Sequence, residues 1–186
     1  RRTFFHPQDY GQKHQTLIAS ARAGNVIGGG DWGEDRLVPD IVRAIQDSGQ
    51  VSIRNPHACR PWLHVLEVLS GYLLLGQRLF EGDAECARAW NFGPSDKDIL
   101  RVQEIVRLFK SKWDVFDFVT KTDANQPHEA RLLRLDCSQV RCKLGWKPVW
   151  SAETAVNKTV DWYKSYYEHN EILCSKHIEE YLSEAC

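Results

Sequence analysis

Asn25 and Arg60 are the two residues of this sequence best placed for chemistry, because each lies next to an apolar run. Asn25 follows the strand-like stretch 16–23 and precedes residues 28–35, a loop rich in glycine and acidic side chains, with the basic Arg36 directly after it. Arg60 stands at the entry to a second apolar segment. A neutral amide can position a diphosphate while guanidinium groups take its charge through paired hydrogen bonds. The arrangement therefore suits a bound diphosphate.

The elements that must position these residues alternate between strand-like and helix-like patterns. We predict a buried strand at 16–23, a loop at 25–35 and a helix at 37–45, where Pro39 is tolerated in the first turn. Strands and helices then follow in turn, at 51–54, 65–80, 89–94, 102–113, 115–119, 138–144 and from Ser151 to Tyr167. The tryptophans expected in the core are Trp62, Trp90, Trp146, Trp150 and Trp162. The predicted fold class is α/β, one compact unit of a length that makes one core feasible, with a polar tail at 168–186 that contains one helical stretch.

The glycines of residues 28–33 match the dinucleotide-binding pattern Gly-x-Gly-x-x-Gly, but the neighbouring charges argue against that role. In a true fingerprint the pyrophosphate lies on bare backbone amides at a helix N-terminus. Asp31, Glu34 and Asp35 would place negative charge there. We therefore interpret the segment as a flexible loop that borders a binding site.

The composition is that of an ordinary globular domain. The chain is 42% hydrophobic and 26% charged with a formal net charge of −1, which gives no reason to expect nucleic acid or a membrane as a partner. The six cysteines form no C-x-x-C pair and lie at no metal-ligand spacing from a histidine. We expect no metal site, and reduced cytoplasmic thiols in preference to three disulfides. Because the sequence begins at Arg1 and contains no methionine, we also expect it to be a processed chain or part of a longer protein.

Several motifs resemble, in the expected order, the C-terminal half of the CDP-glucose 4,6-dehydratase family, a group of extended short-chain dehydrogenase/reductases. The match runs from about Phe4 to Tyr167 and is carried by residues 25–32, 35–40, 54–62, 90–94, 127–130, 135–138 and 144–148. The resemblance implies the last strands of a Rossmann-type sheet plus a small substrate-binding α/β subdomain. Residues 1–186 would then form a single substrate-binding portion.

The resemblance also implies a reaction. In that family NAD, held mainly by an N-terminal Rossmann half, takes hydride from sugar C4; water is eliminated across C5 and C6, and the hydride returns to C6. The product would be CDP-4-keto-6-deoxyglucose, used for deoxy sugars of surface polysaccharide. This sequence departs from the pattern, because it lacks the Gly-rich phosphate loop and no tyrosine has a lysine four residues on. Without that pair the C4 hydroxyl has no acid/base group, so we expect no catalytic residue and no activity from this chain alone.

The candidate site residues follow from the same resemblance. Those implied to bind substrate are Asn25, Arg36, Leu37, Ile53, Arg54, Arg60, Asn91 and His128. Among them, Arg36 and Arg60 match diphosphate-binding positions, and Ile53 and Arg54 lie where a strand would contact the base. Arg22 and Asn25 are implied to face NAD.

Each of these residues also has a structural interpretation. Asn25 and Asn91 could be turn amides, and an isolated arginine could form a surface ion pair worth ~0–1 kcal/mol. Ile53 could be a core residue, and Arg22 could pair with an acid in the sheet. A lone histidine such as His128 is usually structural.

Two other functions remain open. The chain could belong to a related epimerase or reductase acting on another nucleotide sugar, or it could be a non-catalytic remnant that serves as a binding module and needs only the arginines. We expect the parent protein to form a homo-oligomer. We also expect this chain alone to associate, because strands taken from a larger sheet would leave an edge exposed.

Overall fold

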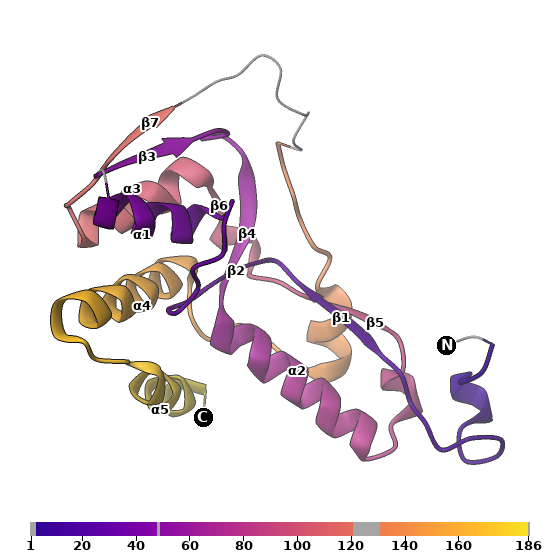
Figure 1. The fold of residues 1–186 in the computed structure, drawn as a ribbon. Helices are drawn as coiled ribbons and strands as arrows, with labels where there is room; N and C mark the ends of the chain where they lie inside the picture. The colour runs from indigo at the N-terminus through magenta and orange to yellow at the C-terminus, as the bar shows by residue number, and fades with distance from the viewer. Residues whose placement is uncertain (1–2, 48, 121–130, 186) are drawn as a thin grey trace.

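The computed structural model describes residues 3–47, 49–120 and 131–185, in which strands and helices alternate as expected for an α/β fold (Figure 1). The strands are β1 Ser20–Ala23, β2 Asn25–Ile27, β3 Gln50–Ile53, β4 Cys59–His64, β5 Ala89–Phe92, β6 Ile99–Arg101 and β7 Asp117–Thr120. The α-helices are α1 Leu37–Asp47, α2 Val65–Phe80, α3 Val102–Lys112, α4 Ala152–Lys164 and α5 Cys174–Ala185. Short 3-10 or π turns occur at Pro7–Asp9, Ala84–Cys86, Asp96–Asp98, Val140–Leu144 and Ser165–His169.

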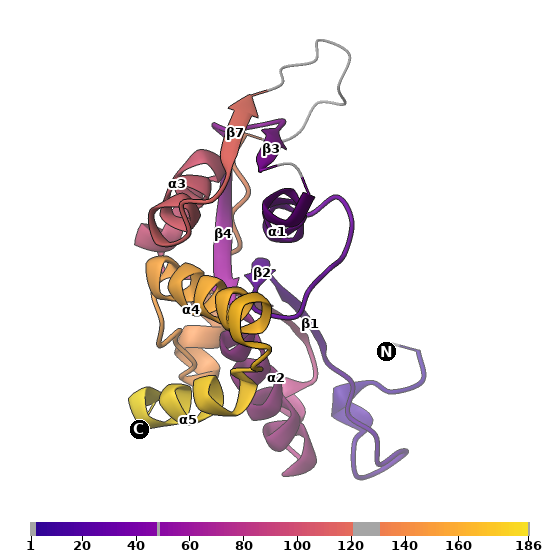
Figure 2. The same ribbon diagram turned by 60° about the vertical axis from the view of Figure 1, so that its left-hand side comes forward.

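The strands of the described residues pair in three small sheets, mostly in parallel. β1 pairs in parallel with β5, and α2 lies between them in the chain. β4 pairs in parallel with β2 and antiparallel with β6, while β3 and β7 form a separate parallel pair. Figure 1 shows α2, β1 and β5 in one lobe and α1, α3, β3 and β7 in the other, and Figure 2 places β4 between α1 and α3. The first lobe fits the expected end of a Rossmann-type sheet, and the second fits a small α/β subdomain.

The buried apolar residues of the described chain form two clusters. The larger cluster joins α1, α3 and α4 with β3, and it contains Trp62 and Trp162. The smaller one joins α2 and β5 with the Val140–Leu144 turn, and it contains Trp90 and Trp146. The two clusters correspond to the two lobes, each of which packs helices against its own strands. All five tryptophans expected in the core, including Trp150, are buried.

Two strand predictions need correction. The stretch 16–23 forms a strand only from Ser20, and that strand is mostly exposed. Among the described residues β1 pairs only with β5, so its other edge has no strand partner. The predicted loop at 25–35 begins with a strand instead, because residues 25–27 pair with the distant β4. Local sequence patterns cannot reveal pairing between segments this far apart.

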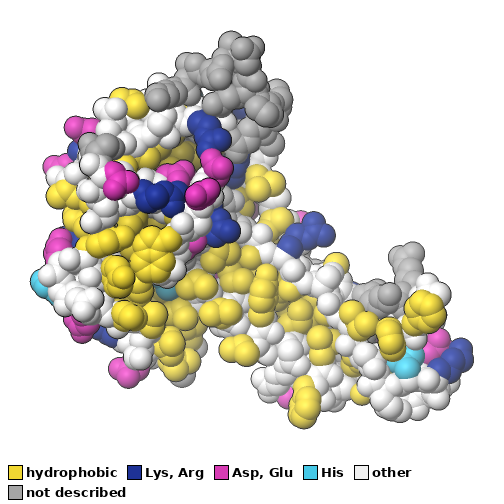
Figure 3. All heavy atoms as spheres, viewed as in Figure 1, with side chains coloured by type: hydrophobic (Ala, Val, Ile, Leu, Met, Phe, Trp, Pro, Cys, Tyr) yellow, Lys and Arg dark blue, Asp and Glu magenta, His cyan; other side chains and the backbone are white. Residues whose placement is uncertain are grey.

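An apolar surface continues from the open strand edge onto α2. Leu73 and Phe80 of α2 are 75% and 95% exposed. Figure 3 shows hydrophobic side chains across the middle of this face, over β1 and α2. Exposed apolar patches and open edges both favour association, so self-association of this chain stays a prediction with a physical basis.

Three further features concern membrane-spanning helices, cysteines and metal ligands. None of the helices in the described ranges is both long and apolar enough to cross a membrane. The cysteines Cys59, Cys86, Cys137, Cys142 and Cys174 are free. In the part of the chain that the structure describes, no three His, Cys, Asp or Glu side chains are grouped so as to hold a metal ion.

A buried polar cluster joins α2 to α5 and to the turn before α4. Glu67, which has no exposed surface, accepts hydrogen bonds from the backbone N–H groups of Val149 and Trp150, at 3.0 and 2.6 Å. It also accepts one from the Tyr181 hydroxyl of α5 at 2.9 Å. Burial raises the pKa of Glu67. The helix expected in the tail is α5, and this cluster fixes it to the rest of the fold.

Acidification is expected to destabilise the fold through His64, the residue that caps α2. The His64 ring is only 3% exposed, and its Nδ1 accepts the Leu66 N–H at 3.3 Å. Burial, reinforced by the charges of His177 and Lys158, lowers the pKa of His64 to about 3. Because the folded pKa lies below the unfolded value of 6.5, the unfolded chain takes the proton first. This contribution to stability is therefore complete above pH ~6.5 and is lost as the pH falls toward ~3.

The comparison of wild type with His64→Asn isolates this effect, because asparagine retains a capping oxygen. Between pH ~6.5 and ~4.5, the wild-type free energy of unfolding should fall by up to about 1.4 kcal/mol per pH unit more steeply than that of the variant. The raised pKa of Glu67 makes stability change with pH in the opposite direction. Because this contribution is present in both proteins, it cancels when their slopes are compared. Urea denaturation at several pH values measures the slopes, and equal slopes would contradict a neutral, buried His64.

Candidate functional site

Four of the predicted residues line one pocket of about 530 Å³. Asn25 begins β2, and Arg60 lies on the neighbouring β4, so the parallel pairing of these strands brings them together. Arg36 and Leu37 reach the same pocket from the start of α1. The other lining residues are Gly24, Val26, Ile27, Gly28, Asp31, Asp35, Val38, Pro39, Trp62 and Val102. An amide and two guanidinium groups thus face one cavity, as the sequence predicted for a diphosphate site.

Arg60 is the most buried of the arginines at this pocket, with 7% of its surface exposed. Its Nη1 donates a hydrogen bond to the Cys59 carbonyl oxygen at 2.9 Å. A cation in such a poorly solvated position is stabilised by nearby negative charge. Arg60 therefore contributes a largely buried positive charge to the pocket wall.

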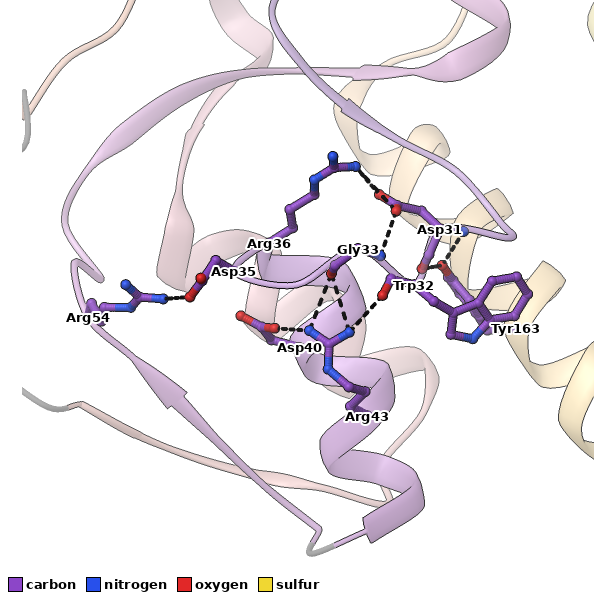
Figure 4. A network of polar contacts seen from close by, with 9 residues as sticks. All are labelled: Asp31, Trp32, Gly33, Asp35, Arg36, Asp40, Arg43, Arg54 and Tyr163. Atoms are coloured by element: carbon purple, nitrogen blue, oxygen red, sulfur yellow. Dashed lines mark hydrogen bonds and ion pairs between the residues drawn. The ribbon is translucent and has the colours of Figure 1, made fainter.

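Two ion pairs lie along the rim of the pocket (Figure 4). Arg36 Nη1 is 3.0 Å from the Asp31 carboxylate, and Arg54 Nη2 is 2.6 Å from that of Asp35. For Arg36 this is the surface ion pair that we gave as its structural interpretation. The same residue also lines the pocket, so both descriptions apply to it.

A second hollow of about 310 Å³ adjoins the first, and the two share Asp35, Leu37 and Val102. Ile53 and Arg54 line this second hollow. Ile53 is also buried in the larger core cluster, as its structural interpretation required. The predicted base-contacting residues therefore lie next to the predicted diphosphate residues.

Three predicted residues are not brought to these hollows. Asn91 lies on β5, where its side-chain amide donates a hydrogen bond to the Asp136 carbonyl oxygen at 3.0 Å. Arg22 lies opposite Asn91 in the β1–β5 register and is exposed. His128 lies outside the described residues. Their proposed ligand contacts stay predictions.

Sequence reasoning missed two aspartates that line the main pocket and one arginine that lines a further hollow. Asp31 and Asp35 line the pocket, although we read them only as an argument against a dinucleotide fingerprint. Arg131 lines a further hollow of about 480 Å³ together with Arg54 and His57. Its position directly after the motif at 127–130 was the available signal.

The loop at 28–35 borders the pocket as predicted, and its first half packs against α4. A Cβ on Gly29 would lie 2.0 Å from the Trp162 ring, so only glycine allows the backbone this close. The Tyr163 hydroxyl accepts the Asp31 N–H at 3.0 Å and donates to the Asp31 carbonyl oxygen at 2.6 Å. Burial raises the pKa of Tyr163 to about 12, so the hydroxyl keeps its proton at neutral pH.

The same contacts decide whether this loop fits the pyrophosphate of NAD. The Asp31 N–H is taken by Tyr163, and the Gly33 N–H donates to Asp31 Oδ1 at 2.9 Å. These amides are therefore not available as a phosphate cradle. Of the two predicted NAD contacts, only Asn25 lies at the pocket. The described residues fit an edge of the cofactor at most, and not its pyrophosphate.

Replacing Gly29 by alanine is expected to disrupt the loop. The new methyl group would overlap the Trp162 ring, and relieving such overpacking costs about 1–3 kcal/mol of stability. Gly76 of α2 is the matched control, because a Cβ there has no atom within 4 Å. Gly76→Ala should stabilise the helix by about 0.5–1 kcal/mol. Urea denaturation of both variants provides the test, and a Gly29→Ala protein as stable as wild type would contradict the packing described.

Solved structures place this architecture in a known class. The chain superimposes with a TM-score of 0.69 on UDP-glucose 4-epimerase from Thermotoga maritima, solved with UDP-glucose, at 22% identity over 89% of this chain and 52% of that one. It superimposes with a TM-score of 0.62 on dTDP-glucose 4,6-dehydratase from Bacillus anthracis, solved with NAD, at 19% identity over 81% and 46% of the two chains. The fold is that of part of an extended short-chain dehydrogenase/reductase.

Sequence comparison with curated proteins is more specific. Over 185 residues the chain is 45% identical to CDP-glucose 4,6-dehydratase of Salmonella typhimurium, covering 98% of this chain and 51% of that protein. The chain is therefore similar to the C-terminal portion of a CDP-glucose 4,6-dehydratase. It spans about half the length of the curated relatives it matches. A comparison with protein-family models gave no match.

Proposed function

We propose that this chain is the CDP-glucose-binding portion of an NAD-dependent CDP-glucose 4,6-dehydratase, which forms CDP-4-keto-6-deoxyglucose. The observation that carries the proposal is the single pocket lined by Asn25, Arg36 and Arg60. Its support is strengthened by the 45% identity to a protein of that activity.

The diphosphate and the base of the ligand each have a counterpart in the two adjoining hollows. The diphosphate lies between Arg36 and Arg60, whose guanidinium groups bind its oxygens, and the Asn25 amide donates to it. The base lies in the adjoining hollow beside Ile53. Arg54 pairs with Asp35, which lines both hollows, so its guanidinium group lies between the base and the diphosphate. Binding energy from these contacts would orient the glucose for a reaction whose other groups lie outside this chain.

The chain on its own then binds substrate without converting it. NAD, when bound to the other half of the proposed enzyme, supplies the hydride acceptor. The acid/base pair of the family is also missing from this sequence, as no tyrosine precedes a lysine by four residues. What the described residues contribute is the binding and orientation of the nucleotide sugar.

Calorimetric titration of the chain with CDP-glucose, UDP-glucose and NAD tests this proposal. We expect CDP-glucose to bind, UDP-glucose to bind more weakly, and NAD to give no signal. Preference for UDP-glucose would point to an epimerase-like specificity instead. Absence of binding by all three ligands would refute an independently folded substrate site.

A further inference from the structure

The rim of the pocket carries two carboxylates that hold two of its arginines. Asp31 holds Arg36, and Asp35 holds Arg54, in the pairs shown in Figure 4. Both aspartates line the main pocket, and Asp35 also lines the adjoining hollow. Each carboxylate therefore occupies one arm of a guanidinium fork that a diphosphate could use.

These pairs can exchange partners at low cost. The Arg36 side chain is 65% exposed and that of Asp35 is 81% exposed. Ion pairs in such well-solvated positions contribute little to stability. An arginine that binds phosphate oxygens through both arms of its fork forms a stronger and more directional contact.

A third ion pair nearby differs from these two, because its arginine also binds the backbone of the loop. Arg43 pairs with Asp40 and also donates to the backbone carbonyl oxygens of Trp32 and Gly33, at 3.0 and 3.3 Å (Figure 4). It ties the loop to α1. In the part of the chain that the structure describes, Arg36 and Arg54 contact one carboxylate each. The contacts of Arg43 thus hold the loop independently of the other two arginines.

We propose that Asp31 and Asp35 are placeholder anions, which hold Arg36 and Arg54 at the pocket until the diphosphate of the ligand displaces them. This inference rests on the proposed function. The two carboxylates keep the guanidinium groups positioned at the rim, and they also compete with the ligand. They select for a ligand with enough negative charge to displace both, because a singly charged anion gains less from the exchange.

The test uses Asp31→Asn and Asp35→Asn, which remove the charges and keep the local geometry. Asp31 Oδ1 also accepts the Gly33 N–H at 2.9 Å, and an asparagine oxygen can do the same. Asp35 has a φ of 56°, which asparagine tolerates well. Asp35→Gly is a second variant that suits this φ. Asp47→Asn, at the far end of α1, is the control for a change in net charge.

Each variant is titrated with CDP-glucose and with inorganic pyrophosphate at low ionic strength, after thermal unfolding confirms that it is folded. The three variants at Asp31 and Asp35 should bind both probes about three- to tenfold more tightly than wild type, and Asp47→Asn should match wild type. Weaker or unchanged binding in these variants, with normal binding by wild type, would overturn the placeholder role alone. If wild type and all variants fail to bind either probe, the proposed function fails and this inference fails with it.

Discussion

Arg60→Ala is expected to abolish measurable CDP-glucose binding. Arg60 is buried at the wall of the main pocket, where a guanidinium group is poorly solvated and an anion gains most from it. Hydrogen bonds to charged groups are worth about 1.5–3 kcal/mol each, so losing a paired contact should weaken binding by about 100-fold or more. Calorimetric titration against wild type measures the loss.

Two further variants make the Arg60 result specific. Arg60→Lys keeps the charge without the planar fork, so its affinity should be intermediate. Arg22→Ala removes an exposed arginine on β1, away from the pocket, and should leave CDP-glucose binding unchanged. Thermal unfolding of each variant separates loss of the site from loss of the fold. A folded Arg60→Ala protein that binds within about threefold of wild type would show that the diphosphate lies elsewhere.

Glu67→Ala is expected to cause the largest loss of stability among the substitutions considered, about 3–5 kcal/mol. The substitution would leave the buried N–H groups of Val149 and Trp150 without their acceptor, and the Tyr181 hydroxyl would lose a partner. It would also weaken the attachment of α5, which contacts this cluster through Tyr181. Guanidinium denaturation, followed by circular dichroism, measures the change.

Glu81→Ala provides the control for Glu67. Glu81 caps the other end of α2 and pairs with Arg78 on the surface, so its loss should cost less than about 1 kcal/mol. Glu67→Gln keeps the size but replaces one acceptor oxygen by a donor, and it should fall between the two. If Glu67→Ala destabilises the chain no more than Glu81→Ala does, the buried cluster does not hold α5 as described.

The helices were largely predictable because their signals are local. α2 begins and ends at Val65 and Phe80 as the apolar periodicity predicted, and the Ser151 hydroxyl caps α4 by accepting the Thr154 N–H. β2 was missed because three residues carry no periodic pattern, and the strand exists through its pairing with β4. The exposure of β1 depends on what lies beside it in space, which the alternation of its residues does not encode.

The candidate site could be predicted in part. Asn25, Arg36, Leu37 and Arg60 lie together, and they were identified by motifs rather than by spacing alone. Asn91 also came from a motif, yet its amide is committed to the Asp136 carbonyl oxygen. The pairing of Asp31 with Arg36 and of Asp35 with Arg54 required geometry, because charge alone cannot tell which acid meets which base.

Mapping CDP-glucose onto the chain by amide NMR tests the central claim most directly. We predict that the ligand shifts the backbone amides of residues 24–28 and 36–38, together with the side-chain signals of Asn25 and Arg60. The exposed amides of β1 and α5 should stay unchanged. Saturating CDP-glucose that leaves residues 24–28 and Arg60 unaffected, or that shifts only signals remote from this pocket, would contradict the account.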